Sequence, residues 1–251
     1  MNEPIDLAYA LGWGAWIFRE LVPIRNLGSY LTESRPLNRL LDPFARSGEP
    51  CLIVLPSLNL PKEMPKYFVK EIEEKEVALS YTEPLMSTYD SIAASYFHSI
   101  LSRAGKKTDE VIVKQDEDLS DDEMNENIVC IGLWSNSIAN MVNKKSPYFK
   151  FESNGKLGWI SSSSNPNLYY DKEKNLSYGL LLKLWDAFHK KKAVIVAGGL
   201  SPDATAAAAY HLYSEYKDLA KKYSKSSFGE VIKINTDIGY KSARRYLEWK
   251  P

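Results

Sequence analysis

Two short segments place glycines and small polar residues directly after apolar runs, a pattern able to hold an anionic or nucleotide-like group. Gly198 and Gly199 follow the β-branched run Ala193–Ala197 and precede an alanine-rich helical stretch. Glycines let backbone amides approach a ligand, and the N-terminus of the next helix offers unpaired N–H groups and positive dipole potential. The segment Gly132–Asn136 follows the apolar run Ile128–Ile131 in the same way. In a parallel sheet both turns would share the edge at which α/β proteins bind ligands.

The side chains around these turns suit the parts of a nucleotide. Asn136 could hydrogen-bond a ribose or an amide, Trp134 could stack on a base, and Ser201 with Thr205 could donate to phosphate. The carboxylate of Asp203 would compete with phosphate for the same positive potential, so it favours a sugar hydroxyl, a carboxamide or a metal-bridged phosphate. The predicted ligand-binding residues are Gly132, Trp134, Ser135, Asn136, Gly198, Gly199, Ser201, Asp203 and Thr205.

A purely structural interpretation of the same residues stays open. Ser135 or Asn136 could cap one helix, and Ser201 or Asp203 could cap the helix that begins near Pro202. The glycines would then serve only close packing of strand and helix. Neither turn has the glycine spacing of a standard NTPase loop or of a standard dinucleotide-binding loop, and the residues identify no cofactor.

Two carboxylates are candidates for acid/base work on the same cleft, as in N-glycosidic cleavage. Glu83 precedes the predicted helix Ser87–Ala104, and Asp90 lies in its first turn. Helix capping or solvation explains both residues more simply. His98 is predicted to be exposed, and His211 is expected to lie away from the glycine turn.

These residues need a sheet to position them, and the apolar pattern supplies one. Short β-branched runs alternate with helical stripes, which predicts a three-layer Rossmann-like α/β fold with a mainly parallel sheet. The predicted strands are Cys51–Leu55, Val111–Val113, Ile128–Ile131, the run from Ala193, and Val231–Ile234, with a β excursion between Phe149 and Leu184. We predict a Rossmann-like domain over 49–251 and an N-terminal aromatic helical segment over 1–48.

The N-terminal segment is apolar over a broad surface. Leu7–Phe18 has helical spacing, and Trp13 and Trp16 widen its apolar face. Packing on the main domain is expected, and the alternatives are a homo-oligomer or partner contact and docking on a membrane surface. The stretch is shorter than the about 20 residues that span a bilayer, and Glu3 and Asp6 stand where a signal peptide carries positive charge. We therefore predict a cytoplasmic protein, with a second short helix over Pro36–Phe44.

Composition excludes several partners. Lysine and arginine total 32, as do aspartate and glutamate, so no global field favours nucleic acid or a membrane. Cys51 and Cys130 fall in apolar runs and are expected to be free and buried. Two cysteines and three dispersed histidines do not form a common zinc site. The acidic run Asp116–Glu123 lacks the glycine and glutamate of a calcium loop and is assigned, like His189–Lys192, to a solvated turn.

The order of the two turns resembles a group of prokaryotic Rossmann-like domains, including the C-terminal region of archaeal surface-layer-like proteins. In that group a strand ends in a Gly-Gly-Pro-x-x-Asn type turn, and a later strand ends in Ala-Gly followed by Gly-Thr and alanines. Here Gly132–Asn136 matches the first motif, and Ala197, Gly198 and Ala204–Ala207 match the second, with leucine, tryptophan and alanine replacing glycine and proline at three positions. The resemblance covers about residues 125–235 and implies a fold rather than an activity.

Three functional hypotheses follow. The first is a sensor or effector module that binds a small nucleotide-like molecule at the shared edge. The second is an enzyme that cleaves N-glycosidic bonds of nucleosides or NAD with Glu83 or Asp90. The third is a structural or assembly module whose glycine turns only pack.

Overall fold

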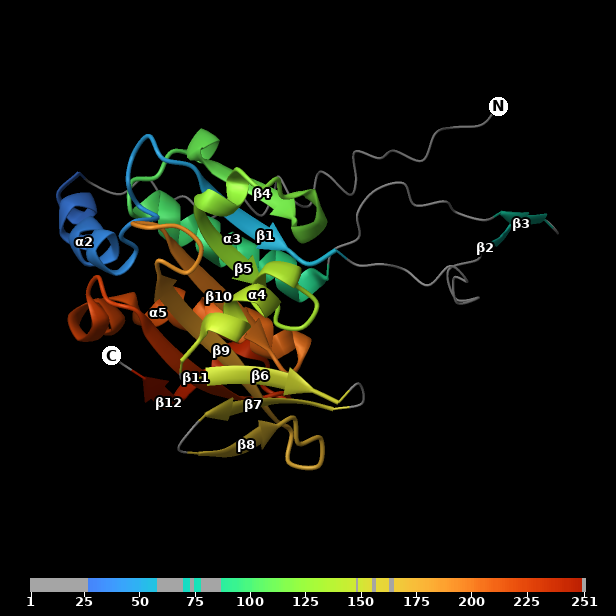
Figure 1. Ribbon diagram of the computed structural model, residues 1–251. Coiled ribbons are helices and arrows are strands. Elements are labelled where there is room, and N and C mark those ends of the chain that lie inside the picture. Colours follow the sequence, from blue (N-terminus) through green and yellow to red (C-terminus); the bar gives the residue numbers. More distant parts are fainter. Residues whose placement is uncertain are drawn as a thin grey trace.

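The structure is a computed structural model. It describes residues 27–57, 70–72, 75–77, 87–147, 149–154, 157–162 and 165–249. A seven-stranded sheet occupies the centre, with the strand order β12-β11-β9-β10-β5-β1-β4 (Figure 1). Its strands are β1 (Cys51–Leu55), β4 (Val111–Gln115), β5 (Asn127–Ile131), β9 (Leu176–Trp185), β10 (Ala193–Gly199), β11 (Phe228–Asn235) and β12 (Arg244–Trp249).

The sheet is parallel on one side and antiparallel on the other. Strands β10, β5, β1 and β4 run parallel to one another. Strand β9 is antiparallel to both β10 and β11, and β12 is antiparallel to β11. The α/β class is therefore confirmed, and the sheet is mixed, with parallel strands at its core. The finer Rossmann-like assignment stays a prediction.

Different structures cover the two faces of the sheet. On one face pack the helices α2 (Leu27–Leu40), α3 (Thr88–Arg103) and α5 (Pro202–Tyr223). The other face carries one short helix, α4 (Ser137–Lys145), and a small antiparallel sheet of β6 (Phe149–Ser153), β7 (Gly158–Ser162) and β8 (Asn165–Tyr169). Figure 1 shows α4 in front of the main sheet and the small sheet at the bottom of the molecule. A separate two-stranded ribbon pairs β2 (Lys70–Ile72) with β3 (Lys75–Val77).

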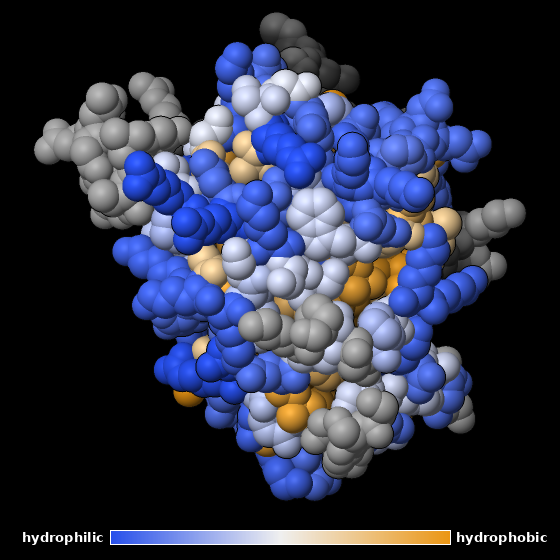
Figure 2. Space-filling view, turned by 60° about the vertical axis from the view of Figure 1, so that its left-hand side comes forward, coloured by the Kyte–Doolittle hydropathy of each residue, from blue (hydrophilic) through white to orange (hydrophobic). Residues whose placement is uncertain are grey.

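Alternation of side chains along the central strands builds two hydrophobic cores. Cys51 and Ile53 of β1 face the helical layer, whereas Leu52 and Val54 face α4 and the small sheet. Both faces are covered, so these strands are apolar along their whole length. Cys51 and Cys130 are free and buried, as predicted, and burial raises the pKa of the Cys51 thiol to about 12. On the outer face that Figure 2 shows, hydrophobic surface is confined to small separate areas among hydrophilic side chains.

The helix predicted over Pro36–Phe44 begins nine residues earlier and ends sooner. Helix α2 spans Leu27–Leu40, so Pro36 lies inside the helix and not in its first turn. Proline in a helix interior removes a backbone donor and is unfavourable there. Leu37 and Leu40 are nevertheless buried against the helical layer, and this packing favours the helix. The aromatic stretch Leu7–Phe18 lies outside the described residues.

A buried lysine ties α2 to the sheet. Lys183 lies in β9 with no exposed surface, and its Nζ donates to the carbonyl oxygens of Leu40 at 2.6 Å and Asp42 at 2.7 Å. Carbonyl groups at a helix C-terminus lack helical partners, so the ammonium satisfies them. Burial lowers the pKa of Lys183 to about 7, although the nearby Asp42 carboxylate opposes this shift.

We expect the free energy of unfolding to rise between pH 7 and pH 9 because of Lys183. The folded pKa lies below the unfolded value, so in this range the unfolded chain binds more protons, and a rising pH favours the folded state. Over these two pH units the gain is about 2 kcal/mol. Urea denaturation at each pH measures it. Lys183→Met should abolish the rise, while Lys190→Met, at an exposed position, should retain it; equal slopes in wild type and Lys183→Met would contradict the assignment.

Candidate functional site

The two glycine turns lie side by side at one edge of the sheet, as predicted. Strands β5 and β10 are parallel neighbours in which Ile131 pairs with Ala197, so both chains leave the sheet at the same level. The N–H of Gly132 donates to the carbonyl oxygen of Ala197 at 2.9 Å. Below, this side of the sheet is called the carboxyl edge.

The first turn is closed by its own asparagine. Asn136 is fully buried, and its Oδ1 accepts hydrogen bonds from the N–H groups of Ile138 at 3.0 Å and Ala139 at 3.1 Å. Its Nδ2 donates to the carbonyl oxygens of Val54 and Ile131, each at 3.0 Å. The side chain therefore caps α4 and joins it to β1 and β5, which leaves none of its hydrogen-bonding groups for a ligand.

A carboxylate occupies the same helix start. The oxygens of Asp116 accept the N–H groups of Ser57 at 2.7 Å and of Ser137 at 2.6 Å. Burial alone would raise the pKa of Asp116, but the hydrogen bonds from Ser137 and Ser57 hold that pKa below its usual value. The Asp116 carboxylate therefore supplies the negative charge that the N-terminus of α4 favours.

The assignment of the whole acidic run Asp116–Glu123 to a solvated loop is therefore wrong at its first residue. Register explains the difference: Gln115 of β4 pairs with Leu55 of β1, so Asp116 emerges beside Ser57. A carboxylate directly after a parallel strand was the available signal. Asp118, Asp121 and Asp122 are exposed, as predicted.

The second turn is closed by close packing of backbone. A Cβ on Gly198 would lie 2.6 Å from the carbonyl carbon of Gly132, and a Cβ on Gly199 would lie 2.4 Å from the Cβ of Ala204. These contacts are closer than real Cβ atoms make, so glycine is required at both positions. The glycines here bring β10 against the first turn and against α5.

The polar residues of the second turn also bond within the chain. Ser201 caps α5 by accepting the N–H of Ala204 at 3.4 Å, and it donates to Ser177 Oγ at 2.8 Å. Thr205 is buried. The carboxylate of Asp203 accepts the hydroxyl of Tyr89, which raises the pKa of that tyrosine. Ser201, like Asn136, acts as a helix cap.

Trp134 and Ser135 are the two remaining candidate residues of the first turn. The indole of Trp134 covers Gly158 of β7, where an added Cβ would lie 2.4 Å from the ring, and it meets Phe151 edge-on with centroids 5.9 Å apart. The Nε1 atom is buried and has no partner among the described residues. Ser135 is exposed. The ring that was predicted to stack on a base therefore packs on the small sheet.

A groove of about 640 Å³ opens immediately beside the two turns. Its lining includes Leu200, which follows Gly199, and Gly158, which packs on Trp134. The segment after β8 supplies two tyrosines followed by three charged residues. The lining residues are Leu157, Gly158, Tyr169, Tyr170, Asp171, Lys172, Glu173 and Leu200.

The groove combines apolar, cationic and anionic groups. The Tyr169 side chain is 43% exposed, and its ring lies 5.8 Å from the ring of Trp159. Lys172 and Glu173 are exposed, whereas Asp171 pairs with Lys174 at 3.0 Å, which lowers the pKa of Asp171. The rings of Tyr169 and Tyr170, next to the separate charges of Lys172 and Glu173, can hold a small, partly planar, polar molecule.

Sequence reasoning missed this segment. The succession of two tyrosines and three charged residues is visible in the sequence, but nothing in it places the segment beside Leu200. That proximity arises because β8 belongs to the small sheet whereas β9 returns into the main sheet next to β10.

The two predicted catalytic carboxylates are not placed in the groove. Glu83 lies outside the described residues. Asp90 is buried in the first turn of α3, where burial raises its pKa and the Ser87 side chain partly opposes that rise. Helix α3 covers the face of the sheet opposite to the small sheet. Asp90 is not among the residues that line the groove.

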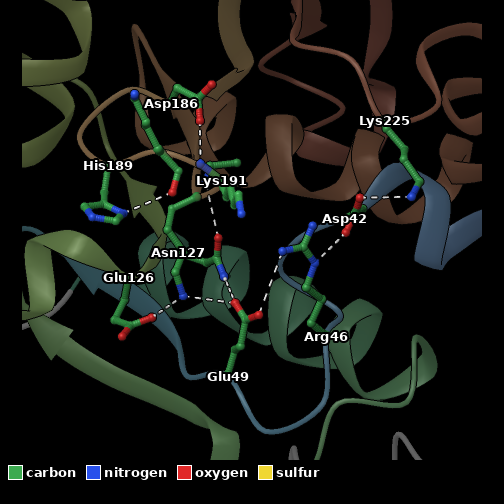
Figure 3. A network of polar contacts seen from close by, with 12 residues as sticks. Asp42, Arg46, Glu49, Glu126, Asn127, Asp186, His189, Lys191 and Lys225 are labelled. Atoms are coloured by element: carbon green, nitrogen blue, oxygen red, sulfur yellow. Dashed lines mark hydrogen bonds and ion pairs between the residues drawn. The ribbon is translucent and has the colours of Figure 1, made fainter.

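The opposite end of the sheet carries a network of charges. His189 and Lys191 are exposed, in keeping with the predicted solvated turn. Lys192 departs from that prediction, because its Nζ bridges Glu49 at 2.9 Å and Glu126 at 2.8 Å. Figure 3 shows Glu126, Asn127 and Glu49 converging there. This network ties the amino ends of β1, β5 and β10 together and is separate from the groove.

No protein-family model matches the chain, and no curated protein is significantly similar to it. The resemblance to prokaryotic Rossmann-like domains therefore stays a prediction. Within the part of the chain that the structure describes, no helix has both the length and the apolar character needed to cross a bilayer.

Proposed function

We propose that this protein binds a small nucleotide-like molecule in the groove at the carboxyl edge, as a sensor or effector module. The observation that carries the proposal is the position of the groove. The groove has a volume of about 640 Å³. Its lining includes Leu200, which follows Gly199 of the second turn, and Gly158, which packs on Trp134 of the first. In α/β proteins the space outside the carboxyl ends of parallel strands is where ligands bind.

The groove residues, and not the turns, would contact the ligand. Asn136, Ser201 and Asp116 already use the N–H groups at the starts of α4 and α5. A phosphate would therefore pair with the exposed ammonium of Lys172, which can act as a point charge. The half-exposed ring of Tyr169 offers a surface for a base, and Glu173 can accept hydrogen bonds from sugar hydroxyls.

A ligand panel with three variants at two groove residues tests the proposal. Thermal shift and calorimetry with adenosine, AMP, cyclic AMP and NAD should show at least one ligand that raises the melting temperature. Tyr169→Ala should weaken that binding about tenfold or more, whereas Tyr169→Phe keeps the ring and should bind nearly as wild type. Lys172→Ala should weaken binding of AMP but not of adenosine.

Lys190→Ala is the matched control, because Lys190 is also an exposed lysine but lies at the opposite end of the sheet. It should leave all affinities unchanged. The absence of a shift with every ligand would leave the assembly module as the better description. Binding that survives Tyr169→Ala intact would place the ligand outside the groove and contradict the proposed site. Release of free base from the nucleosides or NAD would instead favour the glycosidic enzyme.

A further inference from the structure

Strand β4 forms one end of the main sheet and has an open outer edge. It pairs with β1 from Val111 through Gln115, and in the described part of the chain no strand pairs with its other side. Alternate residues of an edge strand direct their N–H and C=O groups away from the sheet. These groups can accept another extended chain.

The side chains of β4 leave this edge unprotected. Ile112 is 38% exposed and Val113 is 51% exposed, and as neighbours in a strand they point to opposite faces. The single lysine of the strand, Lys114, is held by Glu123 at 2.6 Å. Strand β12, at the other end of the sheet, instead carries Arg244, Arg245 and Glu248, the kind of charged residues that discourage edge pairing.

Exposed carboxylates precede and follow β4 in the chain. Asp109 precedes the strand, and Asp118, Asp121 and Asp122 follow it, with Lys107 the neighbouring exposed cation. The exposed side chains of the chain before and after β4 are therefore mainly acidic, and Glu123 shows that the following segment lies beside the strand. Positive charge on an incoming strand would accelerate and stabilise its docking.

The charge pattern argues against a second copy of the chain. Symmetric antiparallel pairing of β4 with itself about Val113 would bring the exposed Asp109 of one copy near the exposed Asp118 of the other. Like charges that approach each other in this way repel. A basic strand has no such conflict.

We propose that the outer edge of β4 is a docking site for an extended, basic segment of a partner protein, which adds to the sheet as a further strand. Recognition combines backbone hydrogen bonds to β4, apolar contacts with Ile112 and Val113, and pairing of lysines or arginines with the flanking aspartates. This surface lies at the β4 end of the sheet and is independent of the nucleotide-like ligand.

The probe is a labelled peptide, Lys-Arg-Val-Thr-Val-Thr-Val-Arg-Lys, titrated onto the full chain by fluorescence anisotropy. We expect micromolar binding that weakens as salt increases. The same peptide with N-methylated central residues, which cannot donate backbone hydrogen bonds, should bind at least about tenfold more weakly. A version with glutamates in place of its basic residues should not bind.

Protein variants locate the contact. Val113→Lys should reduce peptide affinity about tenfold or more, and so should the double change Asp118→Lys with Asp121→Lys. Ile238→Lys, at a position that is 70% exposed outside β4, should not change it. Equal binding by Val113→Lys and Ile238→Lys, no peptide binding, or equal binding of the glutamate peptide would overturn the proposal. A dimer in sedimentation that Val113→Lys dissociates would overturn it as well, because a second copy would then occupy the edge.

Discussion

Replacing Asn136 with alanine is expected to lower the free energy of unfolding by about 4 kcal/mol, because four hydrogen bonds of roughly 1 kcal/mol each are lost in a buried site. The variant leaves the N–H groups of Ile138 and Ala139 without their cap and the carbonyl groups of Val54 and Ile131 without their donor. Urea denaturation measures the loss.

Asn136→Asp separates the two halves of this side chain. The carboxylate retains an acceptor for the two N–H groups, but it turns a second oxygen toward the carbonyl oxygens of Val54 and Ile131. We expect a loss similar to that of alanine at pH 7 and partial recovery in acid, where a protonated carboxyl can donate again.

The matched control is Asn140→Ala, since the Asn140 side chain makes one hydrogen bond, to the carbonyl oxygen of Trp134 at 2.9 Å. It should cost about 1 kcal/mol. If Asn136→Ala were as stable as Asn140→Ala but lost nucleotide binding, Asn136 would be a ligand residue and the closed turn described above would be wrong.

Replacing Glu230 with alanine is expected to cost about 3–5 kcal/mol, the usual penalty for removing one partner of a buried charged network. Glu230 is fully buried on β11, and its carboxylate contacts His211 Nε2 at 2.7 Å and the hydroxyl of Tyr223 at 2.7 Å. Arg245 adds a longer ion pair at 3.4 Å. The alanine variant leaves His211 and Tyr223 buried without their acceptor.

The contribution of Glu230 also has a defined pH dependence. Burial alone would raise its pKa, but the hydrogen bonds from His211 and Tyr223 hold that pKa below its usual value. A lowered folded pKa gives stability that is present above the unfolded pKa and is lost as pH falls through the folded value. The difference between wild type and Glu230→Gln should therefore shrink below about pH 4.5.

Urea denaturation at pH 7 and pH 4 tests this, with Glu248→Gln as the control. Glu248 is 45% exposed and pairs with Arg245 at the surface, so its loss should cost less than about 1 kcal/mol. Equal destabilisation by Glu230→Gln and Glu248→Gln would show that the buried network is not a major source of stability.

The sequence predicted the elements whose apolar pattern is unambiguous. The strands Cys51–Leu55 and Ile128–Ile131 are continuous apolar runs because both faces of the central sheet are covered, and the stripe of Ser87–Ala104 identifies α3. Helix α2 was misplaced because burial of its leucines outweighs the position of Pro36. Lys183 interrupts the run Leu176–Leu184, and nothing in the sequence indicated that it would bond the carbonyl groups of Leu40 at the end of α2 and of Asp42 beyond it.

The location of the candidate site was predictable in part. Parallel strands that end in glycine turns must share an edge, and β5 and β10 do. The chain could not reveal that Asn136 and Asp116 would fill the helix starts, since capping and ligand binding require the same residue types. The groove depends on a long-range approach of Tyr169–Glu173 to Leu200, which no local pattern specifies.

The most direct test is to map a bound nucleotide on the protein by amide chemical shifts while AMP is titrated. We expect the largest changes at Tyr170, Lys172 and Leu200 in the groove, and little change at Gly132, Ile138 and Ala139, whose N–H groups are already bonded within the chain. Changes centred on Ile138 and Ala139, or none at saturating AMP, adenosine and NAD, would contradict a ligand site beside the closed turns.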